Sequence, residues 1–517
     1  MIPIFVALIA IILSLLAYFT YQAYEATKYW KRRGIVHKKP KLFFGNWPLQ
    51  SWANRKSFGE ILVDYLKDFP DEPFVGFNDF TKPRLLITDV DLIEKILIKD
   101  FNHFVDHGFN VNKDAIDINL FTMKGKEWRS LRYKLSPLFT TTKLKTMYEP
   151  MAECSQSLTS ILDKMDESED VDMKEYISCF AMDVIGSCAY GIDAKNLSQP
   201  DNEFRKMGKK SFDFGAMQVV RMIILNLFPF LAKLLNITFN KREVGDYFCK
   251  VIRDTIDYRK KNGIARNDIL QMFMTLKEKG SIEMHTKDPD DDYLKIEKSN
   301  SPETFEFTDD MMIGHAFSFL NAGFEGTAVS ALLTLYELSQ YSDIQDRVRH
   351  EIQKHVEEAG GTLTYDALKK MTYLEQCVKE TLRKHSLVVV LDRVCTKEYT
   401  LPNGYQLPVG ANLFIVVQAV HNNPRIYPEP EKFRPEHFDP DLKLPSCSFL
   451  TFGNGPRICI AMRFALLEIK HCIAKLLMNH EYKLSPNTKP FRIDVNSAFN
   501  APKDPLLFNI RKIKDSK

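Results

Sequence analysis

The stretch FGNGPRICIA, Phe452 to Ala461, constrains this chain most, because it sets a cysteine between a glycine-rich turn and the start of an amphipathic helix. Gly453 and Gly455 permit backbone conformations that a side chain forbids, so the loop can fold over a large flat ligand and aim N–H groups at the sulfur of Cys459. N–H groups at a helix start favour negative charge, so this thiol can be held as a thiolate. The competing interpretation is an ordinary buried cysteine, a common fate for a free thiol.

The decapeptide resembles the haem-binding signature of the cytochrome P450 superfamily, F-x-x-G-x-R-x-C-x-G. It matches at Phe452, Gly455, Arg457 and Cys459, with Ala461 at the usual final glycine. Further segments resemble the family in the right order from Trp128 to the C-terminus, and the chain looks closest to insect microsomal family 6. The resemblance implies the cytochrome P450 fold, mainly α with a small β-rich portion (α+β). It also implies a haem b cofactor, with Cys459 as the axial ligand of the iron and Arg457 beside a haem carboxylate.

Length and composition leave few other classes open. A chain of 517 residues usually forms two or more domains, but the resemblance implies one catalytic domain, residues 49–517, after an anchor (1–27) and a linker (28–48). The balance of 70 Lys and Arg against 67 Asp and Glu gives +3, too little to indicate a nucleic-acid partner. The nine cysteines show neither a CxxC pair nor regular spacing, so neither a zinc site nor a disulfide framework is expected.

The N-terminal segment predicts a membrane anchor. Ile2 to Phe19 is almost wholly apolar and just long enough to span a bilayer of about 30 Å. The alternative is a cleaved signal peptide, but no basic residue precedes the segment, whereas Lys28, Lys31 and Arg32 follow it. The positive-inside rule then places the N-terminus in the lumen and the remainder in the cytosol, so we expect retention in the endoplasmic reticulum membrane.

The remainder is predicted to be mainly helical. PRLLITDVD predicts a strand, and a helix is expected at Leu92–Ile98. Helices are also predicted over Val171–Gly191 and Phe204–Ile237, the second being either a core helix or a segment that dips into the membrane. The charged stretch Gly280–Glu306 predicts an exposed, flexible insertion.

A long helix is predicted over Thr308–Ser339, and it contains AGFEGT. Two glycines cost a helix about 1 kcal/mol each relative to alanine, so they indicate a close approach by another group. In the family the matching segment crosses over the haem. By this resemblance Glu325 is the acidic catalytic residue. Gly326 occupies the usual place of a threonine, and Thr327, the second catalytic candidate, lies one position further on.

Besides Arg457, three residues are candidates for contacts with the haem propionates. Trp128 and Arg132 lie four residues apart, hence on one helical face, where a surface arginine packed on a core tryptophan is the ordinary interpretation. The resemblance instead assigns both to a propionate, because an indole N–H and a guanidinium suit a carboxylate. Arg393 matches the strand arginine that meets a propionate. His107 replaces an arginine often found at its position and is not counted as a contact.

A second motif predicts a structural brace. Glu380 and Arg383 match E-x-x-R, which alone is weak, since (i, i+3) ion pairs are common on solvated helices. The resemblance makes them a buried pair with a third partner from PEKFRPEHF. Arg434 is present there, but His437 stands at the usual arginine, so we expect a chemically altered or pH-sensitive brace.

The resemblance implies a monooxygenase that inserts one atom of dioxygen into lipophilic small molecules, xenobiotic or endogenous. The chain has no dinucleotide-binding glycine motif, so electrons from NADPH must come through NADPH–cytochrome P450 reductase, with cytochrome b5 as a further partner. Two alternatives stay open: a haem-thiolate isomerase or dehydratase that rearranges peroxides without reductase, and a haem-bearing protein that sequesters ligands. The implied substrate pocket, whose members are equally expected of plain core, consists of Phe109, Phe121, Phe317, Leu320, Val388 and Phe499.

Overall fold

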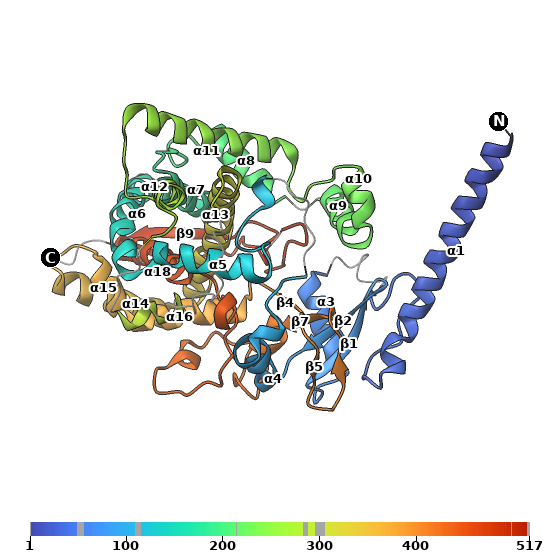
Figure 1. Cartoon of the computed structure of the whole chain (residues 1–517). Coiled ribbons are helices and arrows are strands. Elements are labelled where there is room, and N and C mark those ends of the chain that lie inside the picture. The colour runs from blue at the N-terminus through green and yellow to red at the C-terminus, as the bar shows by residue number, and fades with distance from the viewer. Residues whose placement is uncertain are drawn as a thin grey trace. The chain divides into compact units, whose positions relative to one another are not determined.

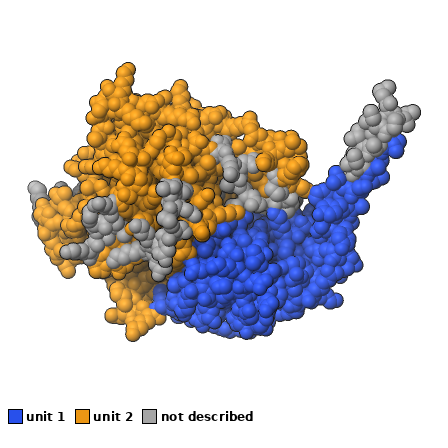
Figure 2. Space-filling view, in the orientation of Figure 1, with its two compact units in different colours: residues 1–108, 388–428, 444–450 blue, residues 109–387, 429–443, 451–517 orange. Residues whose placement is uncertain are grey.

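The computed structural model describes residues 2–48, 56–108, 115–213, 215–282, 288–294, 306–497 and 499–513. The chain divides into two compact units, each assembled from separate stretches of sequence (Figure 2). Unit 1 comprises residues 1–108, 388–428 and 444–450, and unit 2 comprises residues 109–387, 429–443 and 451–517.

Unit 1 is built on a mixed four-stranded sheet in the order β1-β2-β7-β4. Its centre, β2 pairing with β7, is parallel, and the outer pairs are antiparallel. The predicted strand PRLLITDVD is confirmed as β2 with a buried Leu85–Ile87 end, and Asp89 then caps α4 by accepting a hydrogen bond from the Leu92 N–H. The elements of this unit are α1 (Ile2–Arg32), α3 (Phe58–Leu66), β1 (Phe74–Asp79), β2 (Lys82–Ile87), α4 (Val90–Glu94), a π-turn (Lys95–Lys99), a 3₁₀ turn (Phe101–His103), β4 (Val390–Val394), β5 (Tyr399–Thr400), β6 (Gln406–Leu407), β7 (Asn412–Val416) and α17 (Val417–His421).

The C-terminal end of α1 is part of the unit 1 core. Trp30 is buried, donates its indole N–H to the Phe77 carbonyl and lies so close to Gly76 that a Cβ there would meet its ring at 2.5 Å. The segment that follows, predicted as a stiff linker, pairs with β1 through the His37–Gly76 and Gly45–Asp79 bridges. Among the described residues, no helix combines the length and apolar character needed to cross a membrane.

Unit 2 is mainly helical and carries a three-stranded sheet in the order β3-β9-β8 (Figure 1). Its elements are η3 (Ala115–Asp117), α5 (Gly125–Leu135), η4 (Ser136–Phe139), α6 (Thr141–Leu162), β3 (Asp170–Asp172), α7 (Met173–Ile185), the π-turn η5 (Gly186–Tyr190), α8 (Glu203–Ser211), α9 (Ala216–Leu227), α10 (Pro229–Leu234), α11 (Arg242–Asn262), α12 (Ile269–Lys279), η6 (Pro289–Leu294), α13 (Asp309–Gln340), α14 (Ser342–Glu358), α15 (Tyr365–Lys370), α16 (Thr372–Lys384), η7 (Pro435–Phe438), η8 (Gly455–Arg457), α18 (Met462–Asn479), β8 (His480–Leu484) and β9 (Leu507–Lys512).

The predicted long helix is confirmed as α13, the central helix of unit 2. It begins at its Thr308 cap and packs against α7, α16 and α18, so most of its apolar residues are buried on all sides. The expected close approach is found at Gly323, where a Cβ would lie 2.7 Å from Ile185 Cδ1 of α7. Gly314 shows the same effect, since a Cβ there would meet the Ala115 and Ile118 carbonyl oxygens within 2.4 Å.

Two predictions for unit 2 are corrected. The helix expected over Phe204–Ile237 is three helices, α8 to α10. α9 exposes Met217 by 71% and α10 exposes Phe230 by 82%, so these two helices are not wholly core. The stretch Gly280–Glu306 is not wholly an exposed insertion either. Its described residues Asp288–Leu294 dock on the unit through the buried Asp291 and Leu294.

Candidate functional site

The cysteine loop has the backbone that its glycines predict. Gly453 and Gly455 adopt φ of 73° and 69°, in the left-handed region that favours glycine. The chain then turns through η8, and the Cys459 N–H closes the loop by donating to the Phe452 carbonyl at 2.8 Å. α18 begins three residues after the cysteine, at Met462.

The electrostatics of Cys459 differ from the prediction. Burial raises the pKa of the Cys459 thiol, while a hydrogen bond from the Ala461 N–H and the positive charge of Arg132 lower it. Desolvation outweighs both favourable contacts, so the pKa of the thiol lies above its usual value of 9.0. A coordinated metal ion deprotonates a thiol outright, so the loop suits a metal-bound cysteine.

Trp128 and Arg132 both project from α5 into the interior, and both side chains are buried. Among the described residues, the Nε and Nη2 atoms of Arg132 find no hydrogen-bond partner, although both atoms are buried. Burial lowers the pKa of Arg132 to about 10, so the guanidinium still carries its charge at neutral pH. An unpaired buried cation costs several kcal/mol, so this site calls for an anionic acceptor from outside the chain.

Arg457 is engaged differently from the expectation. Its guanidinium donates to the carbonyls of Leu120 and Met123, at 3.1 and 2.8 Å, and its Cζ lies 4.0 Å from the Trp128 ring centroid. In this structure it therefore ties the cysteine loop to the segment before α5. Its predicted carboxylate contact stays a prediction.

Arg393 lies in unit 1, on β4, and is buried there. Its Nη1 donates to the Asp392 carbonyl at 2.7 Å, and its Nε has no hydrogen-bond partner among the residues that the structure describes. His107, which the sequence did not count, holds the Asp392 side chain through a 2.9 Å contact of its Nδ1. Burial lowers the pKa of Arg393 to about 10, with Asp392 opposing the shift, so this second buried guanidinium is also charged.

The catalytic candidates lie on an unbroken stretch of α13. Burial raises the pKa of Glu325, although Lys174 and Lys209 act in the opposite direction. Gly326 accepts a hydrogen bond from Ser330 Oγ at 2.6 Å, and Thr327 is buried. Because the helix stays α-helical throughout, Thr327 is not brought into the position of Gly326 by a local distortion.

The structure brings together only some of the predicted pocket residues. Phe317 and Leu320 are buried on α13, and Phe317 packs against Phe248 of α11. Phe499 lies against Gly326, where a Cβ would be 3.6 Å from its Cζ. Phe121 is largely exposed, Val388 belongs to unit 1, and Phe109 lies outside the described residues.

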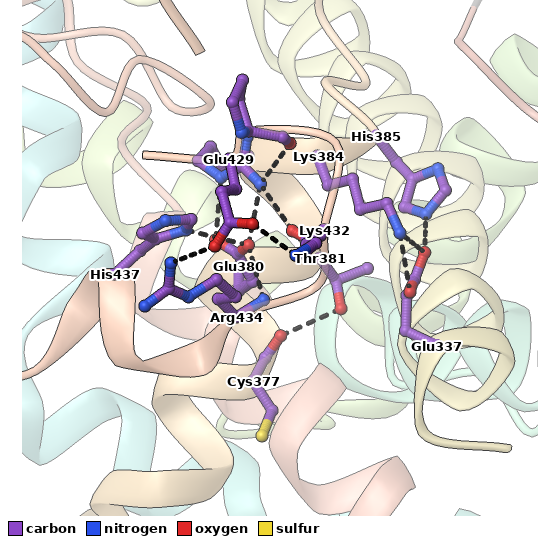
Figure 3. Close-up of polar contacts among 12 residues, drawn as sticks. Glu337, Cys377, Glu380, Thr381, Lys384, His385, Glu429, Lys432, Arg434 and His437 are labelled. Carbon is purple, nitrogen blue, oxygen red and sulfur yellow. Dashed lines mark hydrogen bonds and ion pairs between the residues drawn. The ribbon is translucent and has the colours of Figure 1, made fainter. Parts of the chain in front are cut away.

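The brace is present with a changed third member (Figure 3). Arg383 donates to both carboxylate oxygens of Glu380, at 2.8 and 2.7 Å, and both side chains are fully buried. His437 completes the group, with its Nδ1 3.1 Å from Glu380 Oε1. The prediction for Arg434 is corrected: its backbone N–H reaches Glu380, so its side chain points the other way and pairs with Glu429 at the surface.

Other residues of the site escaped sequence reasoning. Glu337 of α13 is buried between Lys384 and His385 at the end of α16 (Figure 3). Tyr293 and Asp291 meet the start of α18, although they lie in a charged stretch without periodicity. One signal in the sequence indicated that this stretch is packed: Tyr293 and Leu294 directly follow the aspartates. A solvated acidic loop gains nothing from apolar residues.

A cysteine loop before a helix, with a buried arginine nearby, is typical of haem-thiolate proteins, in which a cysteine ligates the iron. A comparison with protein families agrees: residues 37–510 match the family model described as Cytochrome P450, and the chain belongs to that family. It is 36% identical to cytochrome P450 6k1 of Blattella germanica, over 95% of this chain and 94% of that protein. It is 34% identical to cytochrome P450 6A1 of Musca domestica, over 94% of each, and 34% identical to probable cytochrome P450 6a19 of Drosophila melanogaster, over 99% of each.

The chain is thus a haem-dependent P450 monooxygenase of mainly helical fold, related to insect proteins of family 6. The residues present fit the haem that the family implies: Cys459 would ligate the iron, and Arg132 would meet a propionate. When bound, haem supplies the one-electron and dioxygen chemistry that no side chain can perform.

Proposed function

We propose that the protein inserts one atom of dioxygen into lipophilic small molecules of xenobiotic or endogenous origin. Substrate, dioxygen, NADPH and a proton would give hydroxylated product, water and NADP⁺. The observation that carries this proposal is the proximity of Cys459 to Arg132, a buried cation whose Nε and Nη2 have no hydrogen-bond partner in the described part of the chain. Apolar side chains of α13, with Phe499 against Gly326, support a lipophilic substrate.

Electrons would come from NADPH through NADPH–cytochrome P450 reductase, with cytochrome b5 as a second donor. Residues 1–27 would anchor the chain in the endoplasmic reticulum membrane, leaving residues 28–48 as the connection and residues 49–517 as the cytosolic catalytic domain. Exposed apolar side chains on α1, among them Phe5, Leu13 and Leu16, support this arrangement. α9 and α10 would add a second contact, because their exposed apolar residues adjoin a hollow lined in part by Arg221, Lys241 and Arg242.

A specific observation keeps a second function in view. Gly326 offers no hydroxyl, and the regular helix prevents Thr327 from replacing it. A haem-thiolate isomerase or dehydratase that rearranges a peroxide needs no proton delivery during oxygen activation. Peroxide consumption without reductase would favour that enzyme, and ligand binding without any turnover would favour a sequestering protein.

The deciding experiment reconstitutes the purified protein with reductase, NADPH and a panel of plant toxins, insecticides, steroids and fatty acids, after a spectral titration has selected the ligands that bind. We expect oxygenated product only when both reductase and NADPH are present.

Cys459→Ala should abolish the red-shifted carbonyl spectrum of thiolate-ligated ferrous haem, because no soft anionic ligand replaces it. Cys472→Ala, which removes another buried thiol from α18, is the matched control and should retain the spectrum. If the red-shifted spectrum persists in Cys459→Ala, Cys459 is not the haem ligand.

A further inference from the structure

The acidic segment Asp288–Leu294 is fixed to unit 2 by a set of polar contacts. Asp291 is 0% exposed, and its Oδ1 accepts from the Thr141 N–H at 3.0 Å, at the start of α6. The same oxygen accepts from Arg463 Nη1 at 2.5 Å. Asp290 pairs with Lys369 of α15 at 2.6 Å. A solvated loop would not bury a carboxylate in this way, because an unpaired buried charge is costly and this one is fully engaged.

Two contacts of this segment reach the residues just after the cysteine, one at Ile460 and one at Arg463 in α18. Arg463 is the fourth residue after Cys459 and lies in the first turn of α18. Tyr293 donates its hydroxyl to the Ile460 carbonyl at 3.2 Å, and Ile460 is the residue next to the cysteine. Burial raises the pKa of Tyr293, and the charge of Cys459 raises it further, so the phenol stays protonated and remains a donor.

The Ile460 carbonyl and the Ala461 N–H belong to one planar peptide group. Tyr293 donates to the oxygen end of this peptide, and the nitrogen end faces the Cys459 sulfur, where it lowers the pKa of the thiol. Hydrogen bonds in such a chain polarise one another, so a donor on the oxygen strengthens the N–H as a donor to sulfur. It also fixes the plane of the peptide, and with it the direction of that N–H.

We propose that Asp288–Leu294 is a clamp on the cysteine loop, in which Tyr293 and Asp291 are positioning residues that tune the sulfur of Cys459. Tyr293 acts through the Ile460–Ala461 peptide, and Asp291 acts through Arg463 on the first turn of α18. Neither residue touches the substrate. The inference rests on the proposed role of Cys459 as the haem ligand, since only then does the strength of one N–H···S bond set a measurable property of the iron.

The test compares the holoenzyme with Tyr293→Phe, which removes one hydroxyl, and with Asp291→Asn, which keeps the shape but not the charge. Tyr258→Phe on the exposed face of α11 and Asp292→Asn at the exposed neighbouring position are the matched controls. We expect Tyr293→Phe to shift the haem reduction potential to more negative values, because a weaker N–H···S bond leaves more electron density on sulfur. We also expect the red-shifted carbonyl band to decay about two- to tenfold faster in mild urea, the change that corresponds to one hydrogen bond of ordinary strength.

The outcomes separate this inference from the proposed function. If wild type lacks the red-shifted carbonyl band, the role of Cys459 fails and the clamp fails with it. If wild type shows the band but Tyr293→Phe leaves both potential and decay unchanged, the clamp alone is overturned. An equal shift in Tyr258→Phe would also overturn it, because the effect would then not depend on the Ile460 carbonyl. Should Asp291→Asn fail to accumulate as holoenzyme, Tyr293→Phe decides by itself.

Discussion

The missing side chain at Gly326 decides between two routes of proton delivery, one through a hydroxyl and one through Glu325 and water. One residue of an α-helix is a rotation of about 100°, so the Thr327 hydroxyl points away from the direction that a side chain at Gly326 would take. A Cβ at Gly326 would meet only the Phe499 ring, at an ordinary 3.6 Å, so Gly326→Thr should fold. We expect it to raise product formed per NADPH consumed by at least about twofold, because a positioned hydroxyl assists proton delivery.

Gly326→Ala is the control for this prediction, since it adds the Cβ without the hydroxyl and should leave coupling unchanged. Thr327→Ala should also have little effect. Collapse of coupling in Thr327→Ala alone would contradict the regular helix and assign the role to Thr327. If neither position matters, proton delivery runs through Glu325 and water.

At the scale of single residues, sequence reasoning named the right positions more often than the right partners. His437 was recognised as a departure from the expected arginine, but only the structure shows its ring nitrogen 3.1 Å from Glu380. Arg434 was assigned by its charge, yet a backbone N–H that faces Glu380 directs the side chain outward. A sequence pattern fixes which residue type can occupy a position, whereas the direction of a side chain follows from the backbone around it.

At the scale of elements, prediction succeeded where local signals and tertiary packing agree. The Thr308 cap and a 32-residue apolar pattern specify α13, and the β-rich run specifies β2. The helix over Phe204–Ile237 failed because Pro229 and the turn near Gly215 divide it, although its apolar periodicity continues through both. Asp288–Leu294 failed because its packing depends on Arg463 and Thr141, which are far away in sequence.

Glu337 joins the C-terminal part of α13 to the end of α16, and this contact predicts a pH-dependent stability. Burial would raise the pKa of Glu337, but the hydrogen bond from His385 and the charges of His385 and Lys384 outweigh it, so the pKa is lowered below its usual 4.5. A carboxylate whose pKa is lower in the folded state stabilises the fold at pH values above its pKa in the unfolded state. This contribution is lost as the pH falls through the pKa of the folded state. We expect Glu337→Gln to lower the free energy of unfolding by about 1–3 kcal/mol at neutral pH, and by much less in acid.

Urea unfolding of wild type and Glu337→Gln at neutral pH and well below the usual carboxyl pKa of 4.5 measures this difference. The control is Glu358→Gln, which removes an exposed carboxylate that pairs with His355 on α14 and should change stability little at either pH. A difference between wild type and Glu337→Gln that stays constant with pH would show that Glu337 contributes packing rather than charge.

At the scale of the whole molecule, membrane association should divide between two surfaces. Ala23 and Trp30 are buried in unit 1, so removing residues 2–19 rather than the whole of 2–27 spares the packed part of α1. We expect this truncation to keep haem while most of the protein leaves the membrane. Phe230→Ser and Leu234→Ser should release the remainder, since each apolar side chain contributes about 1.5–3 kcal/mol when buried in lipid.

Sedimentation with liposomes after a salt wash measures both steps. Val409→Ser and Leu442→Ser remove exposed apolar side chains elsewhere and should not change the bound fraction of the truncated protein. Loss of haem on truncation would contradict the boundary, and equal release by the control substitutions would contradict a specific role for α10.

The reductase should bind through local rather than overall charge, because the whole chain carries a net charge of only +3. We expect α5 to take part, since it buries Trp128 and Arg132 while Lys126 is exposed on its other side and Lys124 is exposed just before it. We expect the rate of haem reduction to fall as salt rises, because exposed charges are screened beyond about 8 Å at physiological ionic strength.

Lys126→Glu should reduce the rate at low salt and flatten its salt dependence, whereas Lys260→Glu on α11 should do neither. The measurement is stopped-flow reduction under carbon monoxide across a salt series with reductase in excess. A rate that does not vary with salt in wild type would mean that the two proteins dock through apolar surface, and an unchanged slope in Lys126→Glu would place the docking site away from α5.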